Sequence, residues 1–213
     1  MIDNRWHSCK ILVSHQIGRK NNIYMDSFFV EKRFALEIFL YLPLLLRIML
    51  YMKTITLETQ MRVYESREEL PKDLQELLHI AEEAATRAYA KYSHFQVGAA
   101  ILMNNGKVIA GANQENAVYP CGLCAERVAA FAASAAYPEV PFNKIVITAI
   151  NPDEPLKEPV SPCGSCRQVL FEYEQKFGHP IEVILAGQEG PIYHFQNVAT
   201  LLPYTFHAGF LPK

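Results

Sequence analysis

The sequence predicts a three-layer α/β/α sandwich around a mixed β-sheet. Three observations support this fold class. Helical and strand-like patterns alternate along the chain from about residue 66 onward. The run 143–150 is apolar almost throughout, which is typical of a strand covered on both faces. Asn104-Asn105-Gly106 lies between two β-prone runs and predicts a tight hairpin turn, so at least one strand pair is antiparallel.

The first expected element is a long amphipathic helix after Ser66, over residues 67–92. Its apolar residues recur at helical spacing: Leu70, Leu74, Leu77, Leu78, Ala81, Ala84, Ala85 and Ala88. Two β-prone runs follow at 95–103 and 107–113, and the hairpin turn joins them. The run 124–137 is rich in alanine and contains no Gly or Pro, which favours a second helix.

The rest of the chain continues the alternation. The buried strand 143–150 leads into a proline-rich loop at 151–160. A third helix is expected over 166–177, because a Gly and a Pro follow it closely. Two further strands, 181–187 and 191–197, surround a short polar turn.

The charge balance argues against a nucleic-acid binder. The chain carries 20 Lys and Arg against 22 Asp and Glu, and residues 53–213 alone carry 13 basic and 18 acidic residues. Such a surface is a poor non-specific ligand for phosphate backbones. Four of the five cysteines fall in two C-x-x-C clusters, unlike the dispersed set of a secreted disulfide scaffold. We therefore predict a cytoplasmic protein with reduced thiols.

An apolar run at 34–52 raises the question of a membrane segment. A Glu, a Pro and an Arg interrupt it, whereas a span needs roughly 20 apolar residues. The run also lies too far from the start for a cleaved signal, and it lacks a small-residue cleavage site. Met52 opens a short polar stretch that reads like a natural start. We expect no membrane contact, an extension outside the catalytic fold over 1–51, and a catalytic domain over 52–213.

The two cysteine pairs, Cys121/Cys124 and Cys163/Cys166, allow three interpretations. A structural four-cysteine zinc site is possible, although a full helix and a buried strand separate the pairs, where ribbon-like sites have about 15–20 residues. Two redox pairs are less expected in one small domain, because each needs an exposed cysteine with a lowered pKa. The third interpretation is a catalytic zinc site with three cysteines and a fourth position free for water.

The places of three cysteines at helix starts favour the catalytic interpretation. Cys124 begins one predicted helix, and Cys163 and Cys166 lie at the start of another. A helix N-terminus carries partial positive charge, which stabilises a thiolate. Arg127 follows in the next turn and could donate hydrogen bonds to the sulfurs, which would offset the charge of three thiolates on one zinc ion.

Glu126 strengthens this interpretation. It lies two residues after Cys124, in the first turn of the same apolar helix. A carboxylate beside an activated water can take up its proton and return it to a leaving group. If the cysteines were absent, a favourable interaction with the helix dipole would be the simpler explanation.

Asn113 and Glu115 predict a sugar-binding surface. They lie two residues apart at the end of a strand, so both side chains point to one face. An amide beside a carboxylate suits the hydroxyls of a ribose, and the carboxylate repels a phosphate, which favours a free nucleoside. The alternative is a polar strand end in solvent. Phe95 begins a strand and could offer its ring to a base, with core packing as the alternative.

Five motifs together resemble the zinc-dependent cytidine deaminases, in the order expected for that family: KYSHFQVGAA (91–100), NQENA (113–117), CAER (124–127), SPCGSCRQV (161–169) and LLPYTF (201–206). Zinc deaminases as a class pair a ligand-x-Glu motif with Pro-Cys-x-x-Cys. The resemblance covers the chain from about residue 60 to its C-terminus. It implies the α/β fold of the cytidine deaminases.

The resemblance also implies roles for individual residues. It assigns Cys124, Cys163 and Cys166 to one zinc ion per chain and makes Glu126 the proton shuttle. Cys121 occupies a position that the family does not use for zinc.

Two further residues are assigned by the resemblance alone. The backbone N–H of Ala125 would hold the pyrimidine carbonyl, and Phe206 would lie near the ligand, often across a subunit boundary. The all-cysteine ligand set is similar to the homotetrameric branch of the family, so a homotetramer is expected.

The function predicted from these residues is the hydrolytic deamination of cytidine and 2′-deoxycytidine by a zinc-activated water, in pyrimidine salvage. One alternative is a deaminase of another aminated nucleoside with the same fold. Another is a non-catalytic zinc module, which predicts ligation by Cys121 and indifference to the loss of Glu126. A nucleic-acid editor is disfavoured by the acidic balance and by the absence of a basic stretch interleaved with aromatic residues.

Overall fold

The computed structural model describes residues 55–212. The predicted extension over 1–51 therefore lies outside the described residues. Within the described part of the chain, no helix is long and apolar enough to cross a membrane.

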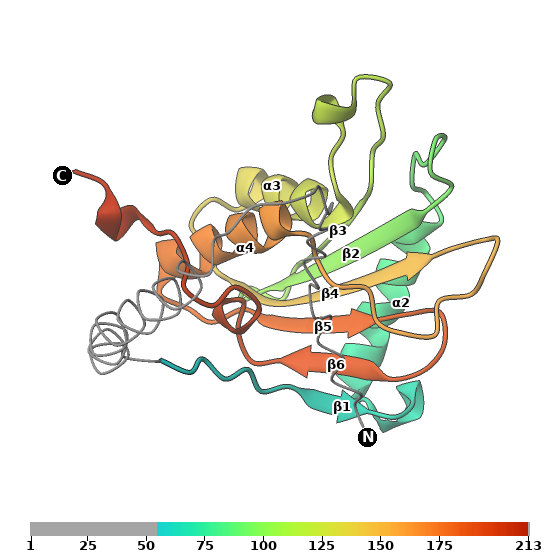
Figure 1. Cartoon of the computed structure of the whole chain (residues 1–213), viewed down its shortest axis with the longest axis horizontal. Helices are drawn as coiled ribbons and strands as arrows, with labels where there is room; N and C mark the ends of the chain where they lie inside the picture. Colours follow the sequence, from blue (N-terminus) through green and yellow to red (C-terminus); the bar gives the residue numbers. More distant parts are fainter. Residues whose placement is uncertain (1–54, 213) are drawn as a thin grey trace, which may run out of the picture. The chain divides into compact units, whose positions relative to one another are not determined.

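The centre of the domain is a six-stranded sheet with the strand order β1-β6-β5-β4-β2-β3 (Figure 1). Its strands are β1 (Arg62–Tyr64), β2 (Gln96–Met103), β3 (Val108–Ala112), β4 (Phe142–Ile150), β5 (Glu182–Ala186) and β6 (Ile192–Phe195). β4 and β5 run parallel, and every other neighbouring pair is antiparallel. The predicted mixed sheet and the predicted hairpin between β2 and β3 are both confirmed.

Helices cover both faces of the sheet, which confirms the three-layer prediction (Figure 1). Helix α2 (Lys72–Ala85) packs on one face. Helices α3 (Ala125–Ala136) and α4 (Gly164–Phe177) pack together on the other. The central strand β4 contributes to both cores, because its alternate side chains, such as Ile145 and Val146, are buried on opposite sides.

The first helix is shorter than predicted. It covers Lys72–Ala85, and Pro71 forms its N-cap instead of lying inside it. The repeat of apolar residues suggests continuation to residue 92, but the backbone of Tyr89 forms hydrogen bonds with Asn113 and Glu115 instead. This long-range pairing overrides the local helical pattern and turns the chain toward the end of β3.

Strand β1 was not predicted from the sequence. It is only three residues long, its residues are largely exposed, and its partner β6 lies about 130 positions later in the chain. A strand of this kind has no strong local pattern, because its stability comes from one ladder of backbone hydrogen bonds with β6.

The remaining elements agree with the prediction to within a few residues. The one change that concerns the cysteines is the start of α4, which begins at Gly164. Cys163 is therefore its N-cap, and Cys166 lies inside its first turn. Gly178, with a φ of 56°, ends the helix in the left-handed conformation.

Close packing of α3 on β3 fixes the position of the start of α3. A Cβ atom on Gly111 would lie 2.5 Å from the backbone nitrogen of Ala129 and 2.7 Å from the carbonyl oxygen of Ala125. No side chain fits there, so the helix lies directly on the strand backbone. The first turn of α3, which carries Cys124 and Glu126 at its start, is held at a distance that only glycine allows.

Candidate active site

A cavity of about 660 Å³ opens on the side of the sheet that α3 and α4 cover. Four segments and Ile147 of β4 line it; the segments are the loop before β2 with the start of that strand, the segment after β3, the first turn of α3, and the loop before α4. Residues from segments about 70 positions apart thus face one space. The lining contains two chemically different groups of side chains.

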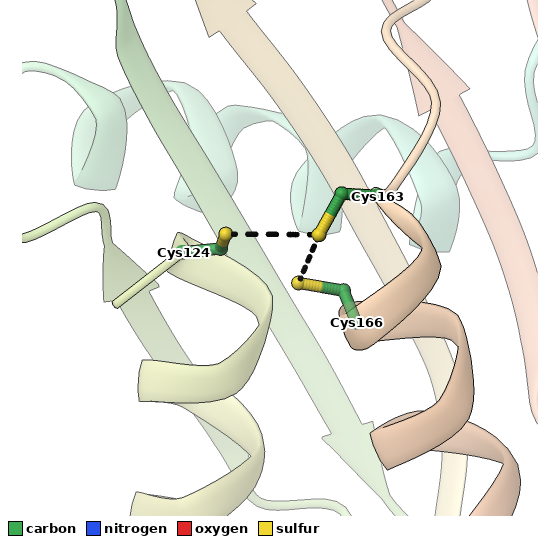
Figure 2. Close-up of side chains that lie close together, drawn as sticks. All are labelled: Cys124, Cys163 and Cys166. Atoms are coloured by element: carbon green, nitrogen blue, oxygen red, sulfur yellow. Dashed lines mark hydrogen bonds between the residues drawn. The ribbon is translucent and has the colours of Figure 1, made fainter. Parts of the chain in front are cut away.

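Beside the cavity, the structure brings three of the four paired cysteines together, and two of them, Cys124 and Cys163, line it (Figure 2). The sulfurs of Cys124, Cys163 and Cys166 all lie within 4.8 Å of one another. The Cys124 and Cys163 sulfurs are 3.9 Å apart, and those of Cys163 and Cys166 are 3.5 Å apart. Cys121 is not part of this cluster; it is exposed in the short turn Tyr119–Cys121.

The three thiols suit a zinc ion. Zinc prefers cysteine sulfur and a tetrahedral arrangement, and a catalytic site supplies three protein ligands. Two of the thiols belong to N-cap residues, Cys124 of α3 and Cys163 of α4. The unpaired N–H groups of these helix ends favour negative charge at the cluster. The donor set and its surroundings therefore fit a zinc ion.

The thiols strongly affect one another's ionisation. The pKa of Cys124 is lowered to about 5, first by a hydrogen bond from the thiol of Cys166 and then by the guanidinium of Arg127. The pKa of Cys166 is raised, because its proton serves Cys124 and because it is buried. A bound cation would favour the thiolate form of the cysteines that coordinate it.

Arg127 lies beside the cluster and lines the cavity. Its Nη2 donates to the sulfur of Cys124 over 3.7 Å. Its Nε is buried and has no hydrogen-bond partner among the described residues. The guanidinium can therefore offset charge on the sulfurs.

Glu126 is buried, with 4% of its surface exposed, and its side chain lines the cavity. Burial raises the pKa of its carboxyl, and the negative charge of Cys124 acts in the same direction. A carboxyl group with a raised pKa next to a reaction centre can both accept and donate a proton near neutral pH. Within the described residues, Glu115 is the one other carboxyl group that lines the cavity.

Asn113 and Glu115 both line the same cavity. Asn113 bonds to the backbone of β2 and the residue before it, since its Oδ1 accepts from the N–H of Val97 (2.8 Å) and its Nδ2 donates to the carbonyl of Phe95 (2.9 Å). Each of these groups keeps one further hydrogen-bonding position. The amide group of Asn113 is thus held in place by the protein, and both of its polar atoms can still bond to a ligand.

Glu115 is held by the loop before β2. Its Oε2 accepts from the backbone N–H groups of Tyr92 (2.7 Å) and Ser93 (3.3 Å), and its Oε1 accepts from the Ser93 hydroxyl (2.5 Å). These bonds, the Ser93 hydroxyl first, lower the pKa of Glu115. The carboxylate is therefore ionised at neutral pH.

The other predicted residues lie in different surroundings. Phe95 lines the cavity. Ala125 is buried as the first residue of α3, so its N–H has no acceptor within the helix. Phe206 does not line the cavity of its own chain in the described structure; it is 59% exposed, stacks on Phe210 and accepts a hydrogen bond at its carbonyl from Gln168.

Two residues that organise the site were missed from the sequence. Ser93 holds Glu115, as described above. Arg167 donates to the carbonyls of Pro162 and Leu201 and to the hydroxyl of Ser161, so it ties the loop before α4 to the C-terminal segment. Neither residue has a distinctive local signal, since a serine in a loop and an arginine on a helix are common, and their partners are far away in sequence.

Comparison with known proteins agrees with this geometry. The family model described as "Cytidine and deoxycytidylate deaminase zinc-binding region" matches residues 71–177. A cytidine deaminase of Halalkalibacterium halodurans is 43% identical over 136 residues, which are 64% of this chain and 96% of that protein. A cytidine deaminase of Sporosarcina psychrophila is 37% identical over 134 residues, which are 63% of this chain and 91% of that protein.

A solved structure also resembles this chain. The crystal structure of a cytidine deaminase from Burkholderia pseudomallei matches with a TM-score of 0.55 and 37% identity, over 64% of this chain and all of that one. The match of the family model spans the segments that carry the three clustered cysteines, Glu126, Asn113 and Glu115. The chain therefore belongs to the cytidine and deoxycytidylate deaminase family of zinc-dependent enzymes.

Proposed function

We propose that this protein removes the C4 amino group of cytidine and 2′-deoxycytidine by hydrolysis, with uridine or 2′-deoxyuridine and ammonia as products. One observation carries the proposal. A buried carboxyl group and the thiols of Cys124 and Cys163, two of the three clustered ones, line one cavity together with an amide and an ionised carboxylate. We assign Glu126 and the thiols to the pyrimidine ring and call them the thiol end of the cavity. We assign Asn113 and Glu115 to the sugar and call them the sugar end.

Cys124, Cys163 and Cys166 would hold one zinc ion per chain. When bound, the zinc ion would supply a Lewis acid that makes a water molecule nucleophilic near neutral pH. Arg127 would hydrogen-bond to the sulfur of Cys124 and limit the charge that three thiolates place on the site.

Glu126 would move the protons of the reaction. Its carboxylate takes a proton from the attacking water as the oxygen adds to C4 of the ring, and it delivers a proton to N3. It would then take the second proton from the new C4 hydroxyl group and pass it to the amino group, so that the C4–N bond breaks, the C4 carbonyl forms and ammonia leaves. Burial supports this role, because a raised pKa brings the carboxyl group closer to the operating pH and makes both transfers feasible.

The start of α3 would also orient the base. The N–H of Ala125 has no acceptor within its helix, and it directly precedes Glu126. It would donate to the pyrimidine carbonyl and so place C4 beside the thiol cluster. Phe95, on the cavity wall, would contact the face of the base.

The sugar end would recognise a single hydroxyl group. A carboxylate offers about four acceptor positions, and Glu115 already uses three of them for Tyr92 and Ser93. The free position on Oε1 can accept from one hydroxyl, and the free N–H of Asn113 can donate to the same oxygen. Cytidine and 2′-deoxycytidine share the 3′-hydroxyl, which explains why both are expected substrates. The charge of Glu115 would disfavour a nucleotide.

A homotetramer is proposed for the active form. Several large apolar side chains lie exposed on the described part of the domain, including Tyr119 (79%), Phe206 (59%) and Phe210 (66%). Exposed aromatic groups of this kind are enriched at subunit interfaces. Association would let Phe206 reach the cavity of a neighbouring subunit. Light scattering after size-exclusion chromatography, on the wild type and Phe206→Ser, tests this.

A cytoplasmic role in pyrimidine salvage also belongs to the proposal. It is supported by the reaction itself, which returns a cytosine nucleoside to the uracil series. Four of the five cysteines fall in two C-x-x-C clusters, and three of them form a metal-binding group, which is the cysteine usage expected in a reducing compartment.

The proposed function is tested with the purified protein in one ultraviolet assay. Cytidine, 2′-deoxycytidine, cytidine monophosphate and single-stranded DNA are offered in parallel, and zinc is measured per chain. Turnover of the two nucleosides by a protein with one zinc per chain supports the proposal. A zinc-loaded protein that turns over neither nucleoside contradicts it.

A further inference from the structure

The loop Tyr92–Phe95 forms one wall of the sugar end of the cavity, through Tyr92, Ser93 and Phe95. Within it, His94 adopts a left-handed backbone with a φ of 57°, which is uncommon for a residue other than glycine. Such a conformation persists only where surrounding bonds hold it. Glu115 accepts three of the hydrogen bonds that hold this loop, and the N–H of His94 itself donates to the carbonyl of Ala90 over 3.0 Å.

The Ser93 hydroxyl connects two groups that would contact the nucleoside. It donates to Oε1 of Glu115 over 2.5 Å and accepts from the backbone N–H of Phe95 over 3.1 Å. One small side chain thus fixes the carboxylate relative to the aromatic ring. The bond to Oε1 is also the only one that the protein makes to this oxygen within the described residues.

This connection decides how many acceptor positions Glu115 presents. With the hydroxyl in place, Oε1 has one position left for a ligand. Without it, Oε1 has two, and the carboxylate is restrained only through Oε2, by the N–H groups of Tyr92 and Ser93. Its free oxygen can then turn toward water or toward a different sugar oxygen.

We propose that Ser93 is a positioning residue for the sugar: through Glu115 and Phe95 it sets which nucleoside hydroxyl the enzyme requires. This inference rests on the proposed function and deepens it. Ser93 does not touch the reacting atoms. Its effect appears in the recognition of the sugar and not in the chemical step.

A purely structural role for the hydroxyl does not fit the surroundings of Ser93. The residue is exposed, and it contributes nothing to either hydrophobic core. The loop retains the bonds from Tyr92 and Ser93 N–H to Glu115 and from Asn113 to the Phe95 carbonyl when the hydroxyl is removed. Ser93→Ala is therefore expected to fold, with only a small fall in melting temperature.

The test compares wild type, Ser93→Ala and Ser93→Thr on cytidine, 2′-deoxycytidine and 3′-deoxycytidine. Because hydrogen bonds to charged groups are strong, Ser93→Ala should raise KM for the first two about tenfold and leave kcat within about twofold. KM for 3′-deoxycytidine should stay unchanged, so the preference for a 3′-hydroxyl shrinks by the same factor. Ser93→Thr keeps the hydroxyl and should restore the preference.

A second measurement asks whether Ser93 acts through Glu115. In a Glu115→Gln background, Ser93→Ala should add little to KM, since the charged partner is already gone. As the pH is lowered, KM should begin to rise at a higher pH in the single Ser93→Ala protein than in wild type. The reason is that the bond from the Ser93 hydroxyl is the largest cause of the lowered pKa of Glu115.

Four outcomes overturn the inference. The first is an equal loss on all three nucleosides, the second is a fall in kcat alone, and the third is full additivity with Glu115→Gln. The fourth is a Ser93→Ala protein with the same KM values as an active wild type. Failure of the proposed function looks different, because then the zinc-loaded wild type does not turn over cytidine at all. A wild type active on cytidine with an indistinguishable Ser93→Ala leaves the function intact and removes only the role of Ser93.

Discussion

Two glutamates line the same cavity, and the pKa values of their carboxyl groups are shifted in opposite directions. Burial raises the pKa of Glu126, and hydrogen bonds lower that of Glu115. Glu126 stands in the first turn of a helix, covered by the core. Glu115 lies on the segment after β3, bonded to a loop. Two carboxyl groups whose pKa values are pushed apart are suited to different tasks.

The two parts of the site hold their side chains in place in different ways. At the thiol end, side chains sit on helix starts whose position is set by close backbone packing, as at Gly111. At the sugar end, side chains are fixed by hydrogen bonds to loop backbone. The thiol end is suited to proton transfer by Glu126. The sugar end is suited to binding a sugar hydroxyl by the permanently charged Glu115. The substitutions of Glu126, Glu115 and Gly111 below each disturb one group of side chains and leave the other intact, and Cys121→Ala should disturb neither.

The largest effect is expected from Glu126→Gln. This change removes the carboxyl group that carries the proton, while the glutamine side chain keeps the size of glutamate and its contacts in α3. The value of kcat should therefore fall by about 10³-fold or more. KM for cytidine should change little, and zinc per chain should remain that of wild type. Stopped-time ultraviolet assays and metal analysis check both. Retained turnover would exclude a proton-transfer role for this residue.

Next in size is the discrimination against a phosphate. Cytidine monophosphate should have a kcat/KM roughly 100-fold below that of cytidine, because like charges brought together in a binding site cost several kcal/mol. Glu115→Gln removes the charge and should narrow this gap. Equal rates for nucleoside and nucleotide in wild type would show that Glu115 does not face the sugar.

Glu115→Gln should also raise KM for cytidine about tenfold with little change in kcat. In wild type, KM should be flat from about pH 5 to 8, because the pKa of Glu115 lies below its ordinary value of 4.5. The bonds that Glu115 makes are present above that value and are lost as pH falls through the lowered pKa. A KM that climbs between pH 7 and pH 6 would contradict this assignment.

A smaller effect is expected from Gly111→Ala. The new Cβ would press on the backbone of Ala129 and Ala125 and displace the start of α3. Overpacking of this kind costs about 1–3 kcal/mol, and kcat should fall severalfold with KM nearly constant. Gly164→Ala is the control, because nothing lies within 4 Å of a Cβ there. Equal melting temperatures for both variants would show that α3 can move without cost.

The smallest effect is expected from Cys121→Ala. Cys121 is exposed and outside the sulfur cluster, so zinc per chain should equal that of wild type. Cys124→Ala, three residues away, should lose the metal. Loss of zinc in Cys121→Ala would revive the four-cysteine site.

Much of the fold could be predicted because its signals are local. The hairpin between β2 and β3 follows from Asn104-Asn105-Gly106, and the strand β4 from an apolar run. The grouping of three cysteines was predicted from their places at helix starts together with a family resemblance. The roles of individual site residues remain predictions for the experiments above.

What the sequence by itself determined is the periodic pattern of helices and strands and the chemistry available at each motif. Only the tertiary structure decided where α2 ends, that β1 pairs with β6, and that Ser93 holds Glu115. The reason is physical. Each of these features depends on hydrogen bonds between residues more than 20 positions apart, and such partners become neighbours only after the chain has folded.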